Sequence, residues 1–314
     1  MNDVMIVGAG ALGTFVGARL AEAGYAVQLL YRSASSALKV KLEGVTLETE
    51  GAPVTVFPDA VTAENAKPAR YVMVFTKTYQ SEEAVRSVLP VLQRDTVLVS
   101  LQNGLGNGER LAGIADLPVV HGVTMIPATL VQPGYVRSKG FTDTWLGALD
   151  ASDPLAESAA QTLAEMLVKA QISAEKVADP LAKIWQKACF NVAMNGICAL
   201  SDGGPGLVHD TPFLKAQAHA LADEAASVAE ALSITIDEDA LHNLIDTACA
   251  AHRFHQPSML QDIRAQRLTE VDSLNGFIVE RAKALNLAVP KNELMTGLLL
   301  GRQYAPEFWQ TQGG

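Results

Sequence analysis

The chain has 314 residues, enough for two domains, and its content of 49% hydrophobic and 18% charged residues excludes extensive disorder. A net charge of -10 without any basic run argues against nucleic acid and anionic membrane surfaces as partners. No apolar stretch is long enough to span a bilayer, and the first residues lack the features of a secretory leader, so we expect a cytoplasmic protein.

The first half of the chain alternates short apolar runs with helical patterns, which is typical of βαβ units and a mostly parallel sheet. The pattern predicts strands over residues 4–7, 27–31, 71–76, 96–101 and 119–124, and helices over 12–23 and 81–92. Residues 129–147 predict hairpin strands that complete the sheet, before a helix over 155–169 and a strand over 172–177. We therefore predict an α/β fold with an N-terminal Rossmann-type doubly wound sheet.

The predicted domain boundary lies at Asp179 and Pro180, because proline disfavours helix at the preceding residue and the pattern changes there. The remaining sequence is almost wholly helical, with predicted helices over residues 182–200, 213–232, 238–252, 258–286 and 292–304. We expect a Rossmann domain over residues 1–178 and an all-α domain over residues 179–314.

A glycine motif joins the first predicted strand to the first predicted helix. It reads Gly8-Ala9-Gly10-Ala11-Leu12-Gly13, which is GxGxxG in the context of a dinucleotide-binding turn. The first glycine permits the tight turn, the second lets the backbone approach a pyrophosphate, and the third lets helix pack on strand. The motif therefore predicts that these six residues bind a dinucleotide.

The end of the second predicted strand indicates which dinucleotide is bound. An NAD site usually has a carboxylate there for the ribose 2′-hydroxyl, whereas residues 29–33 contain Arg32 and no acidic residue. A guanidinium can pair with a 2′-phosphate through two hydrogen bonds. We predict that Arg32 binds NADPH, although a solvated surface arginine is the alternative.

A stripe of polar residues follows one face of the predicted helix over 182–200. Lys187, Asn191 and Asn195 recur at i, i+4 and i+8 among mostly apolar neighbours. Buried donors need partners, so the stripe meets either a polar ligand or other helices, and the pattern alone leaves both open. Burial would also lower the pKa of the lysine toward the range useful for proton donation.

A second polar group begins at Ser258. Together with Gln261 this serine fits a capping box, and a serine at a helix N-terminus is equally a seat for a substrate carboxylate. Glu270 follows twelve residues later and is by pattern alone a surface carboxylate.

The three cysteines, Cys189, Cys198 and Cys249, lie in apolar helical sequence and are expected to be buried thiols. Cys249, His252 and His255 are spaced three apart and could share one stripe of a helix. Because no acidic or cysteine partner is nearby in the sequence, we expect no metal site there.

The chain resembles the ketopantoate reductase family, the 2-dehydropantoate 2-reductases, along its whole length. The resemblance is carried by GAGALG, TKTYQ and LQNGLG, and most specifically by KIWQKACFNVAMNGICAL and SMLQDIRAQRLTEVDSLNGFIVERAKALNLAVPKNELM. It implies the NADPH-dependent reduction of 2-dehydropantoate to pantoate in pantothenate biosynthesis. The implied partner is a small 2-keto acid, and the resemblance is compatible with a homodimer.

The resemblance also implies roles for single residues. For the reacting groups and substrate it assigns proton donation to Lys187, substrate contacts to Asn191 and Asn195, the substrate carboxylate to Ser258, and a place near the nicotinamide ribose to the catalytic Glu270. For the cofactor it assigns the 2′-phosphate to Arg32 and the lining of the site to Lys77, Asn103 and Ala128, with Asn103 also close to substrate.

Two departures from the family pattern concern the substrate. His255 occupies a position where the family often has asparagine, and we expect it to contact substrate, while residues 201–206 lack an asparagine found in relatives. These departures leave open a paralogous reductase of another branched 2-keto acid. A non-catalytic NADPH-sensing protein is a third alternative, against which the intact set of Lys187, Asn195, Ser258 and Glu270 argues.

Overall fold

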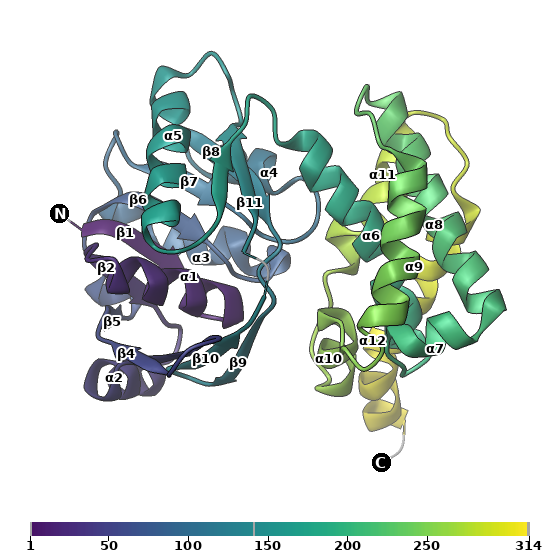
Figure 1. The fold of residues 1–314 in the computed structure, drawn as a ribbon, viewed down its shortest axis with the longest axis horizontal. Coiled ribbons are helices and arrows are strands. Elements are labelled where there is room, and N and C mark those ends of the chain that lie inside the picture. The colour runs from purple at the N-terminus through teal and green to yellow at the C-terminus, as the bar shows by residue number, and fades with distance from the viewer. Residues whose placement is uncertain (1, 141, 313–314) are drawn as a thin grey trace. The chain divides into compact units, whose positions relative to one another are not determined.

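The computed structural model describes residues 2–140 and 142–312 and divides the chain into two compact units (Figure 1). The first unit contains the chain up to Asn103 together with Asn107–Pro180, and the second contains Gly104–Gly106 and the chain from Leu181 onward. The boundary between the units thus lies between Pro180 and Leu181, whereas the sequence predicts that the second domain begins at residue 179. The short segment belongs to the second unit because Leu105 is buried in that unit's apolar core.

The first unit is built on an eight-stranded sheet in the order β12-β11-β8-β7-β6-β1-β2-β5. The six strands β8, β7, β6, β1, β2 and β5 each pair in parallel with their neighbours in this order, and β11 pairs antiparallel to β8. The strands are β1 Asn2–Val7, β2 Val27–Leu30, β5 Asp59–Val61, β6 Ala69–Val74, β7 Val97–Ser100, β8 Val119–Thr124, β11 Thr144–Ala148 and β12 Ala174–Lys176. Most central strands are continuous apolar runs because both faces of the sheet are covered.

Helices cover both faces of this sheet, which confirms the predicted doubly wound α/β fold (Figure 1). The side chains of β1 alternate between two apolar cores, with Val4 and Ile6 in one and Met5 and Val7 in the other. The first core contains residues of α1 and α5, and the second contains residues of α3 and α4. The helices of this unit are α1 Ala11–Glu22, α2 Ala34–Glu43, α3 Ser81–Val88, α4 Asn107–Ile114 and α5 Pro154–Lys169, with short 3₁₀ turns η1 Ala63–Asn65, η2 Thr78–Gln80 and η3 Leu89–Val91.

A separate four-stranded sheet, ordered β4-β3-β10-β9, lies against α1. Its strands are β3 Val45–Glu48, β4 Val54–Val56, β9 Ala128–Gln132 and β10 Tyr135–Ser138. The prediction that residues 129–147 complete the main sheet is therefore only partly right. β9 and β10 do form a hairpin, but it belongs to the small sheet, where β10 pairs with β3, and only β11 joins the main sheet.

The second unit is helical, as predicted, and is organised around the largely buried α6. Its elements are α6 Leu181–Leu200, α7 Pro205–Asp210, α8 Pro212–Ala231, α9 Glu238–Ala251, α10 Ser258–Arg264, η4 Val271–Ser273, α11 Asn275–Ala284 and α12 Pro290–Gln312. Helices α8, α9, α10 and α12 all pack on α6.

The helix predicted over residues 258–286 is in fact interrupted after α10. Gln266 adopts a positive φ of 52°, and the guanidinium of Arg267 donates two hydrogen bonds of 3.0 and 2.9 Å to the buried carboxylate of Asp262. A buried carboxylate needs such donors. This local contact closes the turn that follows α10, although the helical spacing continues in the sequence.

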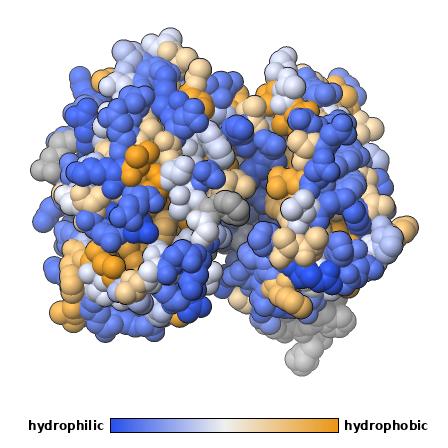
Figure 2. Space-filling model, viewed as in Figure 1, coloured by the Kyte–Doolittle hydropathy of each residue, from blue (hydrophilic) through white to orange (hydrophobic). Residues whose placement is uncertain are grey.

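Figure 2 shows polar and charged residues over most of the visible face of each unit, with apolar residues scattered among them. Within the part of the chain that the structure describes, no helix combines the length and apolar character needed to cross a bilayer.

Candidate active site

The turn between β1 and α1 contains three glycines. The fold crowds the first and the last of them and leaves open space at the middle one, Gly10. Gly8 has a φ of +102°, and a Cβ there would lie 2.5 Å from the backbone nitrogen of Thr76. A Cβ on Gly13 would lie 2.2 Å from the carbonyl oxygen of Gly8, whereas a Cβ on Gly10 would have no heavy atom within 4 Å. The first and third glycines are therefore needed by the fold, and the second leaves space for a ligand beside the backbone.

The N-terminus of α1 fits an anionic ligand. Its N-cap, Gly10, offers no side chain to the first backbone N–H groups, and the first turn contains no acidic residue. Uncapped N–H groups and the helix dipole both favour a phosphate at this position. The predicted contact residues Ala9, Ala11 and Leu12 are half-buried around this turn.

Three other predicted cofactor residues follow neighbouring strands of the main sheet. Arg32 comes shortly after β2 and is exposed, Lys77 follows β6, and Asn103 follows β7. Because these strands are parallel to β1, the residues lie at the same edge as the glycine turn, where the order of strands reverses. Ala128 differs, since it begins β9 of the small sheet, which packs on α1.

A buried amide that sequence reasoning missed joins two of these loops. The side chain of Gln102 donates hydrogen bonds to the Thr76 carbonyl (2.7 Å) and to the Ser81 hydroxyl (2.8 Å). It thereby ties the chain after β7, which carries Asn103, to the chain after β6, which carries Lys77. The only signal in the sequence is a polar residue at the end of an apolar strand, and its partners lie more than twenty positions away.

In the second unit, α6 presents the predicted polar stripe. Lys187 and Asn191 are half-buried, and Asn195 is buried at 8% exposure. Burial lowers the pKa of the Lys187 amine to about 8, and the carboxylate of Glu270 opposes this shift by favouring the charged amine. Glu270 lies directly before η4. The structure therefore couples the two residues predicted to be catalytic, and gives Lys187 a pKa suited to proton donation.

The capping box predicted at Ser258 is wrong. Pro257 is the N-cap of α10, Ser258 is its first helical residue, and the Gln261 amide donates to the Gln256 carbonyl at 2.7 Å. No side-chain hydrogen bond caps the start of α10, Ser258 is exposed, and α10 packs on α6. His255 is exposed in the preceding loop.

The cysteines are all buried and reduced. Cys249 donates a hydrogen bond to the Met194 sulfur at 3.7 Å, while His252 caps the end of α9 and His255 lies in the following loop. Among residues 2–140 and 142–312, no group of three His, Cys, Asp or Glu side chains could hold a metal ion.

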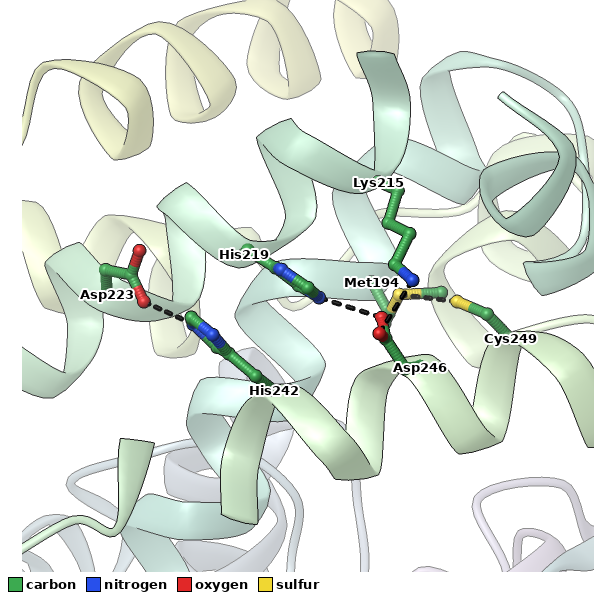
Figure 3. A network of polar contacts seen from close by, with 7 residues as sticks. All are labelled: Met194, Lys215, His219, Asp223, His242, Asp246 and Cys249. Atoms are coloured by element: carbon green, nitrogen blue, oxygen red, sulfur yellow. Dashed lines mark hydrogen bonds and ion pairs between the residues drawn. The ribbon is translucent and has the colours of Figure 1, made fainter. Parts of the chain in front are cut away.

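Two other histidines of this unit belong to a network of polar contacts between α8 and α9 (Figure 3). The rings of His219 and His242 stack with their centroids 4.3 Å apart. His219 contacts Asp246 at 2.9 Å and His242 contacts Asp223 at 2.5 Å, while Lys215 also pairs with Asp246. Each helix supplies one histidine and one aspartate, so this network joins the two helices.

Comparison with known families gives matches over both units. Residues 4–151 match the family described as ketopantoate reductase PanE/ApbA, and residues 179–303 match the family described as its C terminal part. The 2-dehydropantoate 2-reductase of Pyrococcus horikoshii is 31% identical over 305 residues, which cover 96% of this chain and 97% of that protein. The corresponding enzyme of Archaeoglobus fulgidus is 33% identical, covering 96% of this chain and 98% of its own length.

A solved structure extends the comparison to another activity. The ternary complex of D-mandelate dehydrogenase with NADH and anilino(oxo)acetate has a TM-score of 0.90 and 27% identity, and covers 96% of this chain and 99% of its own.

Proposed function

The chain belongs to the ketopantoate reductase family, and we propose that it reduces 2-dehydropantoate to pantoate with NADPH as the hydride donor. The observation that carries the proposal is the partly buried Lys187 on the polar stripe of α6, with its lowered pKa and its coupling to Glu270. An amine of this kind can act as a general acid toward an oxygen that gains negative charge.

The residues of the first unit fit a nicotinamide dinucleotide. Gly10 leaves space beside the uncapped start of α1, and the loops after β2, β6 and β7 lie at the same sheet edge. When bound, the dinucleotide supplies a hydride to the keto carbon. In the proposal Lys187 gives a proton to the keto oxygen, so that the ketone becomes a secondary alcohol.

The remaining predicted residues would orient the substrate. Asn191 and Asn195 present amides on the same face of α6 as Lys187 and would hold keto or hydroxyl oxygens. The Ser258 hydroxyl would bind the carboxylate, and Asn103 would contact both substrate and cofactor. Correct placement of these groups contributes to the rate because the reacting atoms then meet in a productive geometry.

Steady oxidation of NADPH, followed by absorbance, tests the function directly. We expect oxidation when 2-dehydropantoate is added, at a higher kcat/KM than with pyruvate, 2-ketoisovalerate or phenylglyoxylate. A higher kcat/KM with another of these acids would assign the chain to the second candidate function, a paralogous 2-keto acid reductase. No oxidation with any of them would contradict the reductase itself.

Two observations favour this second candidate. His255 stands where the family often has asparagine, and residues 201–206 contain no asparagine. The D-mandelate dehydrogenase complex further links this fold, at 27% identity, to a ligand with an aromatic group. The panel of 2-keto acids separates the two candidates because phenylglyoxylate, unlike 2-dehydropantoate, carries an aromatic group and no alcohol hydroxyl.

Arg32 tests the preference for NADPH over NADH. We expect Arg32→Ala to raise the KM for NADPH by about 10- to 100-fold, because a hydrogen-bonded charge pair with the 2′-phosphate is lost. The KM for NADH should change little. Arg94→Ala, at an exposed arginine of the same unit, is the matched control. Equal changes in both KM values for Arg32→Ala would mean that the 2′-phosphate is bound elsewhere.

A further inference from the structure

Two asparagines with no exposed surface form a hydrogen-bonded chain that leads into α6. Asn275 begins α11, and its amide donates to the Val192 carbonyl of α6 at 3.2 Å and to the Asn292 side-chain oxygen at 3.0 Å. Asn292, near the start of α12, donates in turn to the Leu221 carbonyl (3.2 Å) and to the Glu224 carboxylate (2.8 Å), both on α8. The chain of amides therefore connects four helices.

The direction of these hydrogen bonds is fixed by their partners. A carbonyl and a carboxylate can only accept, so Asn292 must turn its NH₂ group toward Leu221 and Glu224 and its oxygen toward Asn275. Asn275 must then present its own NH₂ group to Asn292 and Val192. Its oxygen is left without a partner among the described residues. A leucine at this position would avoid that cost, which indicates that the donated hydrogen bonds are what the asparagine contributes.

The bond from Asn275 to Val192 joins the two segments that carry the proposed catalytic pair. Val192 lies five residues after Lys187 on α6, and Asn275 lies five residues after Glu270. Two hydrogen bonds close the intervening turn, because the backbone N–H and the hydroxyl of Ser273 both donate to the Glu270 carbonyl at 3.1 Å. A shift of Asn275 would therefore be transmitted to Glu270.

We propose that Asn275 is a positioning residue, which fixes the separation between Glu270 and Lys187 by binding the Val192 carbonyl. The effect of Asn275 on turnover rests on the proposed function, whereas its effect on the separation between Glu270 and Lys187 does not. The effect on Glu270 can be measured at Lys187 itself, because the Glu270 carboxylate raises the pKa of this amine against the effect of burial. If Glu270 moves away, the pKa of Lys187 falls.

The experiment compares Asn275→Leu, Glu270→Gln and the double variant in the full chain without substrate. NMR titration of the Lys187 side chain gives the pKa of its amine in each. We expect Asn275→Leu to lower this pKa in the same direction as Glu270→Gln, and the double variant to fall no lower than Glu270→Gln alone. Such non-additivity shows that both substitutions remove one interaction. In turnover assays, kcat should fall about tenfold with the KM for NADPH unchanged.

Leu241→Ala is the matched control, because Leu241 is fully buried in the same core on α9 but its apolar side chain forms none of the hydrogen bonds of the amide chain. It should lower the free energy of unfolding and leave the pKa of Lys187 unchanged. The same result for Asn275→Leu, or full additivity with Glu270→Gln, would overturn the proposal. If Asn275→Leu does not fold, the shorter Asn275→Ser should give a smaller shift in the same direction. A wild-type chain that reduces no 2-keto acid would contradict the proposed function, while the titration would still decide the role of Asn275.

Discussion

Lys187→Ala is expected to lower kcat by about 10²- to 10⁴-fold, which is the range typical of a lost general acid. The reason is that negative charge developing on the keto oxygen would no longer receive a proton from a positioned amine. Binding of NADPH should be nearly unchanged, because the glycine turn and Arg32 belong to the other unit. Stopped-flow or steady-state oxidation of NADPH gives kcat, and fluorescence titration gives the dissociation constant of NADPH.

Lys283→Ala provides the control for this variant, since Lys283 is an exposed lysine of the same helical unit on α11. It should retain wild-type kcat. Near-normal turnover of Lys187→Ala would remove Lys187 from the mechanism, and loss of NADPH binding together with turnover would point to a folding defect instead.

The pH dependence of kcat should report the same amine. Burial lowers the pKa of Lys187 to about 8, and only the protonated amine can donate, so kcat should fall as the pH rises through about 8. Glu270→Gln removes the carboxylate that favours the charged amine, and the fall should then begin at a lower pH. A basic limb that stays in place in Glu270→Gln would show that Glu270 does not set this pKa.

The parts of the fold that could be predicted are those in which burial dictates the sequence. Strands β1, β6 and β8 are mostly apolar runs because both faces are covered, and α1 follows β1 with helical spacing. The strands β3 and β4 were not predicted, because only Val45 and Leu47 of β3 are buried and β4 is mostly exposed. The break after α10 was also missed, since it depends on the burial of the Asp262 carboxylate, which helical spacing does not reveal.

The candidate site shows the same division. The glycine turn and the stripe of α6 were visible because their members are close in sequence and their spacing has a direct geometric meaning. Gln102 and Asn275 were not visible, because their partners are backbone carbonyls 26 and 83 residues away. The homodimer that the resemblance allows stays a prediction, as do the roles of the single site residues.

Gly10→Ala is expected to weaken NADPH binding more than it lowers the free energy of unfolding. Gly13→Ala is expected mainly to lower the free energy of unfolding. A methyl group on Gly10 meets no protein atom within 4 Å, so the free energy of unfolding should fall by at most about 1 kcal/mol. The same methyl occupies the space proposed for the pyrophosphate, and lost contacts between backbone and phosphate should weaken NADPH binding by about 10- to 100-fold. Gly13→Ala instead forces a Cβ to 2.2 Å from the Gly8 carbonyl oxygen and should cost about 1–3 kcal/mol or more in unfolding free energy.

The pair is informative because each variant controls for the other. Chemical denaturation gives the two unfolding free energies, and fluorescence titration gives the two dissociation constants for NADPH. If the space beside Gly10 is the pyrophosphate site, Gly10→Ala should lose affinity while remaining close to wild type in stability. A Gly10→Ala variant that binds NADPH normally would mean that the dinucleotide does not approach this turn, and the assignment of the first unit as the cofactor-binding unit would then fail.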